Sequence, residues 1–298
     1  MWIPGKQKYN YLVWSVEKEE VLKKVLIEEM GISLRMISEL KSRRAVNVNG
    51  TLRFNHEPVH VGEIITVDLG ENRSEYGLEE GVVDVIYEDE DIVAVNKAPF
   101  IVVHPTGTHL TGTLLNYMES WFRQNGILEK VRFISRLDRD TSGILLIAKN
   151  RYAHHRMSQA HQAMMMQKTY VALIEGKMKR KEGEINAPIG RRENDGIKRE
   201  VMEDGQTAIT KYRVLKEGEK FSLVELTPVT GRTHQLRCHM AYIGYPLIGD
   251  SLYGGNMEYM NRQALHSVTL EFFSPRKEEK IYLKAELPQD MQELVNRL

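Results

Sequence analysis

Several features that define whole classes of protein are scarce in this sequence. Its 298 residues contain one cysteine, Cys238, which excludes an internal disulfide framework and indicates a reducing compartment. The longest apolar runs, such as residues 144–148, are far too short to cross a bilayer. Residues 1–10 have neither the apolar core nor the cleavage pattern of a signal peptide. We therefore expect a cytoplasmic protein that does not enter the membrane.

Net charge is also missing, because 41 basic residues balance 41 acidic ones. A zero balance normally argues against a nucleic-acid partner. The charges are segregated, however: residues 71–91 carry nine acidic residues against one arginine, and residues 132–199 carry fifteen Lys or Arg against seven Asp or Glu. The second segment therefore keeps a basic excess that would attract a phosphate backbone.

Two units of unequal size are predicted, residues 1–75 and residues 76–298. In the first unit, apolar spacing predicts a helix over residues 18–30 and a second short helix that Ser33 caps. The pair Asn49-Gly50 predicts a hairpin turn, and an acidic stretch with several glycines follows as a linker. The second helix has an expected apolar face of Leu34, Ile37 and Leu40, and its basic residues are Arg35, Lys41, Arg43 and Arg44.

In the larger unit, predicted strands mostly follow one another instead of alternating with helices. Helices are expected over residues 113–124, 153–166 and 233–243. Strands are expected over residues 82–87, 92–96, 143–148, 169–174, 208–215, 221–227, 264–272 and 281–287. This order predicts an α+β fold with a mixed, largely antiparallel central sheet flanked by helices, joined to a small N-terminal α/β domain.

The most informative stretch for chemistry is Arg136-Leu137-Asp138-Arg139-Asp140-Thr141-Ser142-Gly143, which leads into a buried strand. Arginines near a carboxylate favour its ionised form, which suits a nucleophile or a general base. Composition alone favours a plainer interpretation, in which the aspartates cap backbone amides in a turn and the arginines form surface ion pairs.

Two further stretches carry candidate groups. In the segment from Gly231 to His239, Thr233 is a candidate helix cap, and Arg237 is a helix-borne cation suited to a carboxylate or a phosphate. His234 and Cys238 have metal-ligand spacing, but no other residues supply a convincing remainder of a metal shell.

The other stretch is Lys168-Thr169-Tyr170, where the tyrosine offers a flat face to a base, although an ordinary strand aromatic is the simpler interpretation. The run Met164–Met166 is expected to fill the core. Three histidines are expected on a solvated helix face, namely His154, His155 and His161.

In their order along the chain, these motifs resemble the RluA-type family of RNA pseudouridine synthases over about residues 82–288. The matching blocks are Asn96-Lys97-Ala98-Pro99 with Val103-His104-Pro105, Arg136-Leu137-Asp138 through Thr141-Ser142-Gly143, Lys168-Thr169-Tyr170, Gly231-Arg232-Thr233-His234-Gln235-Leu236-Arg237, Gly249-Asp250 with Tyr253-Gly254, and Ala264-Leu265-His266. The N-terminal unit resembles, less closely, the alpha-L RNA-binding domain of the ribosomal-protein S-four type.

The resemblance implies roles for individual residues. Asp138 would be the catalytic aspartate, Tyr170 would stack on the target uracil and assist proton removal, and Arg237 would pair with Asp138. Leu265 would form an apolar wall, and Arg136 would help the target nucleotide leave the stack. Ser135 stands where the family usually has histidine, so a flat ring behind the flipped base is lost. Further substrate-binding residues expected from the matching motifs are Arg139, Thr141, Arg232 and His234.

The implied reaction is the isomerisation of uridine in RNA to pseudouridine, with the aspartate acting either on the sugar or on the base. It requires no cofactor and no metal. Ribosomal large-subunit RNA is the favoured partner, transfer RNA is the alternative, and a monomer without an evident protein partner is expected. The basic residues of the second N-terminal helix would contact RNA.

Two functions from other classes compete with this interpretation. One is a non-catalytic RNA-binding factor for ribosome assembly. The other is a hydrolase with Asp138 and Asp140 as paired carboxylates, for which the spacing gives weak support.

Overall fold

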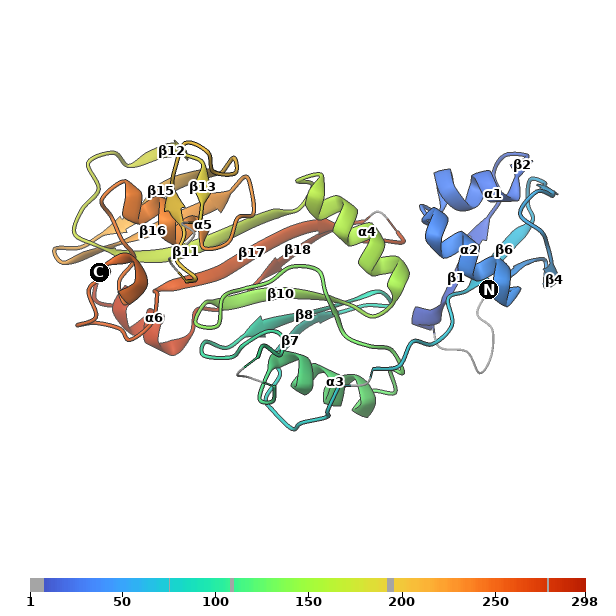
Figure 1. The fold of residues 1–298 in the computed structure, drawn as a ribbon, viewed down its shortest axis with the longest axis horizontal. Helices are drawn as coiled ribbons and strands as arrows, with labels where there is room; N and C mark the ends of the chain where they lie inside the picture. The colour runs from blue at the N-terminus through green and yellow to red at the C-terminus, as the bar shows by residue number, and fades with distance from the viewer. Residues whose placement is uncertain (1–7, 75, 108–109, 192–195, 278) are drawn as a thin grey trace.

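The computed structural model describes residues 8–74, 76–107, 110–191, 196–277 and 279–298. Residues 1–7, where the sequence shows no signal-peptide pattern, and residues 192–195 of the basic segment lie outside this part. Within it, a small N-terminal unit is joined to a larger unit built on a ten-stranded sheet (Figure 1). The helical elements are η1 (Lys8–Asn10), α1 (Leu22–Lys24), η2 (Val25–Glu29), α2 (Leu34–Arg43), α3 (Leu114–Gln124), α4 (Arg151–Gln162), α5 (Gln235–Tyr242), η3 (Ser251–Tyr253) and α6 (Gln289–Val295).

Eighteen strands are formed by the described residues. Those of the N-terminal unit are β1 (Tyr11–Ser15), β2 (Glu20–Val21), β3 (Val46–Val48), β4 (Thr51–Leu52), β5 (Pro58–Val59) and β6 (Ile64–Asp68). Those of the larger unit are β7 (Val85–Glu88), β8 (Ile92–Lys97), β9 (Arg132–Phe133), β10 (Ser142–Ala148), β11 (Gln167–Glu175), β12 (Glu182–Asn186), β13 (Ile189–Gly190), β14 (Glu200–Val201), β15 (Ile209–Glu217), β16 (Phe221–Pro228), β17 (Leu265–Phe273) and β18 (Lys280–Lys284).

The N-terminal unit packs α1, η2 and α2 against an antiparallel sheet of order β1-β6-β3-β4. The hydroxyl of Ser33 accepts a hydrogen bond from the amide of Met36 at 3.3 Å, which confirms the predicted cap. Asn49 and Gly50 both have positive φ angles, as the two-residue hairpin between β3 and β4 requires. The predicted apolar face is wrong at Leu34, which is 65% exposed, because Met36 is the buried side chain of that turn instead.

The larger unit confirms the predicted mixed, largely antiparallel sheet. Its order is β12-β15-β16-β11-β17-β10-β8-β7, with β18 paired to β17 and β9 paired to β10. The pair β10–β17 is parallel, and the other described pairs of this sheet are antiparallel. Helix α3 packs on one face of β8 and β10 and α4 packs on the other. Strand β10 is therefore buried along its whole length, as a strand covered on both faces must be.

Three predicted helices end or begin elsewhere. The helix predicted over residues 18–30 begins at Leu22, because Glu20 and Val21 pair with β5 as strand β2. The helix predicted over residues 153–166 stops at Gln162, and Met164 takes a left-handed φ of 56°. Met164 and Met165 are 61% and 59% exposed, so the prediction that the methionine run fills the core holds for Met166 alone. Helix α5 begins at Gln235 with His234 at the cap position, so that Thr233 does not cap it.

The two units meet through a buried polar junction at Asp91. Arg276 donates two hydrogen bonds to this carboxylate at 3.0 and 2.6 Å, and a third to the carbonyl of Tyr11 at 2.7 Å. The amide of Asn150 donates to both Asp91 and the carbonyl of Tyr9, at 2.8 Å each. The junction therefore fixes β1 and η1 to the larger unit. No helix within the described ranges is long and apolar enough to cross a membrane.

Candidate active site

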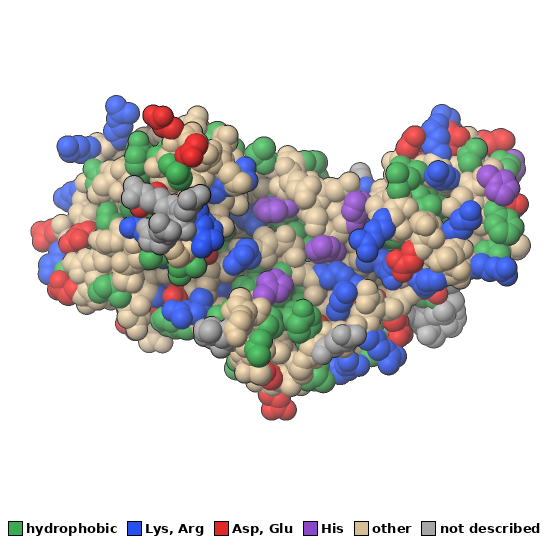
Figure 2. All heavy atoms as spheres, viewed as in Figure 1, with side chains coloured by type: hydrophobic (Ala, Val, Ile, Leu, Met, Phe, Trp, Pro, Cys, Tyr) green, Lys and Arg blue, Asp and Glu red, His purple; other side chains and the backbone are tan. Residues whose placement is uncertain are grey.

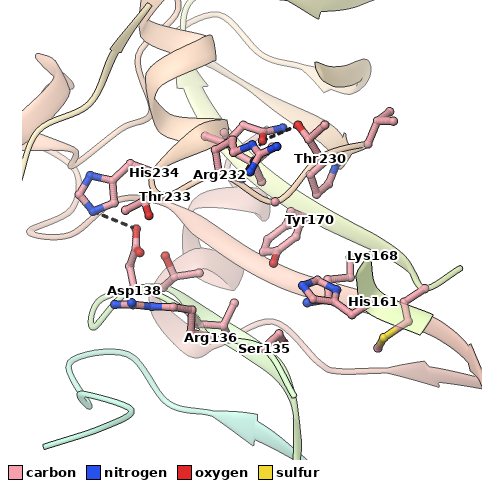
Figure 3. A pocket seen from close by; sticks show the side chains of 18 of the residues that line it. Ser135, Arg136, Asp138, His161, Lys168, Tyr170, Thr230, Arg232, Thr233 and His234 are labelled. Atoms are coloured by element: carbon pink, nitrogen blue, oxygen red, sulfur yellow. Dashed lines mark hydrogen bonds and ion pairs between the residues drawn. The ribbon is translucent and has the colours of Figure 1, made fainter. Parts of the chain in front are cut away.

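The larger unit contains a cavity of about 990 Å³. Its walls come from the loop between β9 and β10, the first residues of β11, the segment from the end of β16 into α5, and the start of β17 (Figure 3). These segments are far apart in the sequence, and the sheet order brings them together because β11 and β10 both pair with β17. Asp138 is the one carboxylate among the described residues that line it.

Asp138 lies in the loop before β10 and faces Arg237 of α5 and His234, which directly precedes that helix. The guanidinium Nη1 of Arg237 donates to the Oδ2 of Asp138 at 3.0 Å, and the Nε2 of His234 lies 3.6 Å from the same oxygen (Figure 3). The Asp138 side chain is 25% exposed. It is therefore held from one side and remains open to the cavity.

Arg237 is itself fixed by a second carboxylate. Its Nε and Nη2 donate to the two oxygens of Asp250 at 2.7 and 2.8 Å, which is the bidentate geometry of a strong arginine–carboxylate pair. The guanidinium also lies over the Tyr253 ring, 5.1 Å from its centroid. Burial disfavours the charged guanidinium, but the hydrogen bond and charge of Asp250 outweigh burial and raise the pKa of Arg237. Arg237 is thus a permanent cation held at a fixed position.

His234 has a left-handed φ of 55°, which turns its ring back toward Asp138. Its Nδ1 lies 3.2 Å from the hydroxyl of Tyr253, and the two rings meet edge to face at 5.9 Å. Burial lowers the pKa of His234, and the charge of Asp138 opposes this shift. The imidazole is therefore neutral at neutral pH and bridges Tyr253 and the Asp138 carboxylate.

Tyr170 lies in β11 and contributes a wall between Asp138 and the far end of the cavity (Figure 3). The strand has a bulge between Thr169 and Tyr170, which places Tyr170 opposite Ser267 of β17. Burial raises the pKa of Tyr170 to about 12, with Asp138 adding to the effect and a hydrogen bond to Ser267 opposing it. The phenol is therefore protonated at neutral pH, so that it offers a ring face and a hydroxyl and cannot supply a phenolate base.

Two buried basic side chains hold the backbone of the Asp138 loop. The ammonium of Lys97 donates to the carbonyl of Arg139 at 2.8 Å, and the Nη1 of Arg262 donates to the carbonyl of Asp140 at 3.0 Å. Arg262 also makes a bidentate pair with Asp290 of α6, at 2.7 and 2.8 Å. The two carbonyls directly after Asp138 are thereby fixed from β8 on one side and from the chain before β17 on the other.

The cavity gathers most of the predicted site residues. Arg136, Thr141, Arg232 and Leu265 line it together with Asp138, Tyr170, His234 and Arg237. Arg139 does not: its guanidinium turns outward and pairs with Asp140 at 2.7 and 3.0 Å. Arg35, Lys41, Arg43 and Arg44 lie on the separate N-terminal unit, where all four are exposed.

Sequence reasoning assigned no role to several residues that support the site. Asp250 and Tyr253 stand in the motif blocks quoted above, and so does Lys97, but only the contacts with Arg237 and with the loop carbonyls show what they do. Asp290 stands in no sequence motif. The sequence signal for Arg262 was only its position three residues before the Leu265-His266 motif.

Ser135 also lines the cavity, and so does the imidazole of His104. The His104 ring packs edge to face on Phe133 at 4.9 Å. The wall that includes Ser135 therefore has an aromatic ring, supplied by His104 from another segment of the chain. His161, which the sequence places on a solvated face, lines the opposite end of the cavity.

His239 and Cys238 of α5 serve packing and hydrogen bonding. Cys238 is buried and its thiol donates to the carbonyl of Arg199. His239 is buried between the hydroxyl of Thr210 and the carbonyl of Ala187, at 2.9 Å each. Within the residues the structure describes, no group of three His, Cys, Asp or Glu is placed to hold a metal ion.

Comparison with known proteins places this chain in one family. A family model described as RNA pseudouridylate synthase matches residues 91–242. The uncharacterized RNA pseudouridine synthase YjbO of Bacillus subtilis (strain 168) is 40% identical over 275 residues, which cover 90% of this chain and 95% of that protein. The ribosomal large subunit pseudouridine synthase D of Yersinia pestis is 33% identical over 269 residues, 85% of this chain and 82% of that protein.

A solved structure agrees with this family assignment. Human RNA pseudouridylate synthase domain containing 1 superposes with a TM-score of 0.59 and 26% identity, covering 74% of this chain and 97% of that chain. The protein is thus an RNA-modifying isomerase. The chain belongs to the RluA-type RNA pseudouridine synthases, which convert uridine in RNA to pseudouridine.

Proposed function

We propose that the chain isomerises uridines of ribosomal large-subunit RNA, with Asp138 as the reacting carboxylate. The observation that carries the assignment is that Asp138 is the one carboxylate among the described cavity-lining residues, held by Arg237 and open to the cavity. The ribosomal substrate is inferred from relatives such as the Yersinia pestis enzyme, whose name states it.

The reaction breaks the bond between uracil N1 and the ribose and joins the ribose to C5 of the same ring. The proton of C5 leaves and N1 gains one, so atoms and electrons balance without another reactant. Asp138 acts on the sugar or on the base, while Arg237 positions its carboxylate. Tyr170 presents its ring face to the uracil and its hydroxyl as a hydrogen-bond partner during proton removal. Leu265 closes the apolar side.

The target base must leave its stack before it reaches Asp138, which costs a few kcal/mol. In this proposal Arg136 fills the space that the base vacates, and Thr141, Arg232 and His234 contact the flipped nucleotide. Arg139 lies outside the cavity and contacts the RNA strand at the rim.

The N-terminal unit, residues 1–75, acts in the same proposal as an RNA-binding arm of the alpha-L type, while residues 76–298 carry the reaction. Support comes from the apolar core of the arm, to which the larger unit adds the side chain of Tyr152, and from the exposed basic side chains of α2. Lysine, arginine and histidine side chains also gather over the middle of the molecule, beside the N-terminal unit (Figure 2). We place the enzyme in the cytoplasm as a monomer, where ribosomal RNA is available to it.

The decisive experiment measures tritium release from ribosomal RNA labelled at uracil C5. Replacing the acid or base of a proton transfer typically lowers the rate by at least about 100-fold, so Asp138→Asn should lose at least that much while RNA binding persists. Asp140→Asn is the matched control, because it makes the same change two residues away in a side chain that pairs with Arg139 outside the cavity.

Three other outcomes would each contradict part of the proposal. Equal and negligible release by the wild type and by Asp138→Asn, with RNA binding retained, identifies a non-catalytic RNA-binding factor. Free uracil in the products identifies a hydrolase. Release from transfer RNA but not from ribosomal RNA keeps the reaction and replaces the substrate.

A further inference from the structure

The active-site cavity has a second end that the reaction does not use. It is formed by the turn between α4 and β11 and is lined by His161, Gln162, Met164, Gln167 and Lys168. Figure 3 shows His161 and Lys168 beyond Tyr170, on the side away from Asp138. A substrate that reaches Asp138 therefore leaves room for a further group at this end.

Lys168 brings a cation without a counter-ion into this end of the cavity. It lies two residues before Tyr170 on β11, and both side chains line the cavity. Its ammonium makes no hydrogen bond or ion pair with any residue that the structure describes. Burial lowers the pKa of Lys168 to about 8. An anion bound here would restore the stabilisation that burial removes from the charged form.

His161 provides a second donor beside Lys168. It lies in the last turn of α4, and burial followed by the charge of Lys168 lowers its pKa. Both side chains line this end of the cavity, and Figure 3 shows them next to each other. An anion between them would favour the charged form of both.

Met164 adds an apolar surface next to these two donors. It is 61% exposed, it lines the cavity, and its left-handed φ of 56° is unusual for a residue other than glycine. The turn is held by hydrogen bonds from the amides of Met164 and Met165 to the carbonyls of His161 and Ala160, at 3.2 and 2.9 Å. A flexible thioether fixed at the edge of a cavity suits contact with a flat ring.

We propose that this end of the cavity, formed by His161, Met164 and Lys168, binds the nucleotide next to the target uridine in the RNA strand. Its phosphodiester lies on Lys168 and His161, and its base lies against Met164. Charge and shape favour this occupant: the strand carries one phosphate per nucleotide, and a cation beside an apolar surface matches a phosphate beside a base. The proposal rests on the RNA substrate of the family and is independent of the role of Asp138.

The charge part is tested with Lys168→Met and a fluorescently labelled hexauridylate RNA, whose affinity is measured by anisotropy over a series of potassium chloride concentrations. We expect about tenfold weaker binding at low salt. The slope of log affinity against log salt should fall by about 0.7, the value for one phosphate of a single strand. Lys168→Arg should keep the slope. Lys177→Met, the same substitution at an exposed position after β11, should change neither quantity.

The apolar part is tested with Met164→Gly, which removes the side chain and suits the left-handed backbone, so the variant should fold at least as stably. Loss of the contact between the thioether and the base predicts about fivefold weaker binding of the same RNA with an unchanged salt slope, since no charge is removed.

Several results would overturn the proposal. One is an unchanged salt slope in folded Lys168→Met. Another is a salt slope that falls as much in Lys168→Arg as in Lys168→Met, which would indicate that the site requires the shape of the lysine side chain and not its charge. A third is a lower single-turnover rate at saturating RNA with unchanged affinity. If Lys168→Met does not fold, Lys168→Arg and Met164→Gly decide. Because binding is measured at equilibrium, failure of the Asp138 assignment appears in the tritium assay and leaves these results intact.

Discussion

At the scale of single residues, Lys97 is a buried lysine whose ammonium holds the loop that carries Asp138. Its side chain is 2% exposed, and its ammonium donates to the carbonyls of Ala98, Ile101 and Arg139 at 2.8, 3.1 and 2.8 Å. Burial lowers the pKa of Lys97 to about 7, with Arg262 lowering it further and Asp140 opposing the shift. In the unfolded chain the ordinary lysine pKa of about 10.4 applies.

This difference gives stability a defined pH dependence. Between about pH 7 and pH 10, the unfolded chain binds more protons at Lys97 than the folded chain does, so the free energy of unfolding rises with pH in that window. Lys97→Met lacks this contribution. In urea unfolding, the wild type should therefore gain about 2 kcal/mol relative to the variant between pH 7 and pH 9. Parallel pH profiles for the two proteins would show that Lys97 titrates as an ordinary lysine.

At the scale of secondary structure, the parallel contact between β10 and β17 fixes where the Asp138 loop lies. Gly143 has a φ of +110°, and a Cβ added there would lie 2.3 Å from the carbonyl oxygen and 2.5 Å from the nitrogen of Ser267. Both atoms belong to the backbone of β17 and cannot move aside. The two strands can therefore approach only if this position has no side chain.

Gly143→Ala should accordingly destabilise the fold by more than the conformational cost alone. We expect a loss of at least about 3 kcal/mol in the free energy of unfolding, because a backbone clash adds to a strained φ. Gly176→Ala is the control: its φ is +70°, with no atom near the added Cβ, so only the conformational cost of about 1 kcal/mol applies. Equal losses, measured by chemical denaturation, would show that β10 and β17 can separate without penalty.

Secondary structure also shows which elements can be predicted from the sequence. The Ser33 cap and the Asn49-Gly50 turn follow from local chemistry and were found from sequence. The end of α4 and the start of α5 were misplaced because Met164 and His234 take left-handed conformations at the cavity, which no local pattern encodes. The pairing of Arg237 with Asp138, 99 residues apart, was expected through family resemblance, whereas its bond to Asp250 depends on tertiary packing and was not foreseen.

At the scale of the whole molecule, the net charge of zero does not reveal how the charged residues are arranged, and α2 lies near the larger unit. Glu39 of α2 forms an ion pair with Arg151 at the start of α4, whose other end reaches the cavity. Lys41 of α2 and Arg44, which follows that helix, are exposed. Arg43 differs, because it donates to the carbonyl of Leu69 at 2.9 Å and supports the fold of the arm.

Reversing the charge at Lys41 and Arg44 tests the RNA-binding role proposed for the arm in the intact chain. Lys41→Glu with Arg44→Glu should weaken binding of ribosomal RNA about tenfold at low salt and reduce the salt dependence, while the single-turnover rate at saturating RNA stays unchanged. Lys18→Glu with Lys23→Glu makes the same change of net charge at two other exposed positions of this unit and should have a much smaller effect. If both double variants weaken binding equally, total charge and not the α2 surface governs affinity.

The clamp on the Asp138 loop also has a consequence for the order in which the protein becomes active. Domains form as the chain is made from its N-terminus. The arm and Lys97 precede the loop, but Arg262 and its partner Asp290 follow Asp138 by well over a hundred residues. A growing chain can thus form the proposed RNA-binding arm before the carbonyl of Asp140 has a donor. Assembly of the Asp138 loop is therefore a late event of synthesis. Under the roles proposed for the arm and for Asp138, the chain gains the capacity to hold RNA before the capacity to modify it.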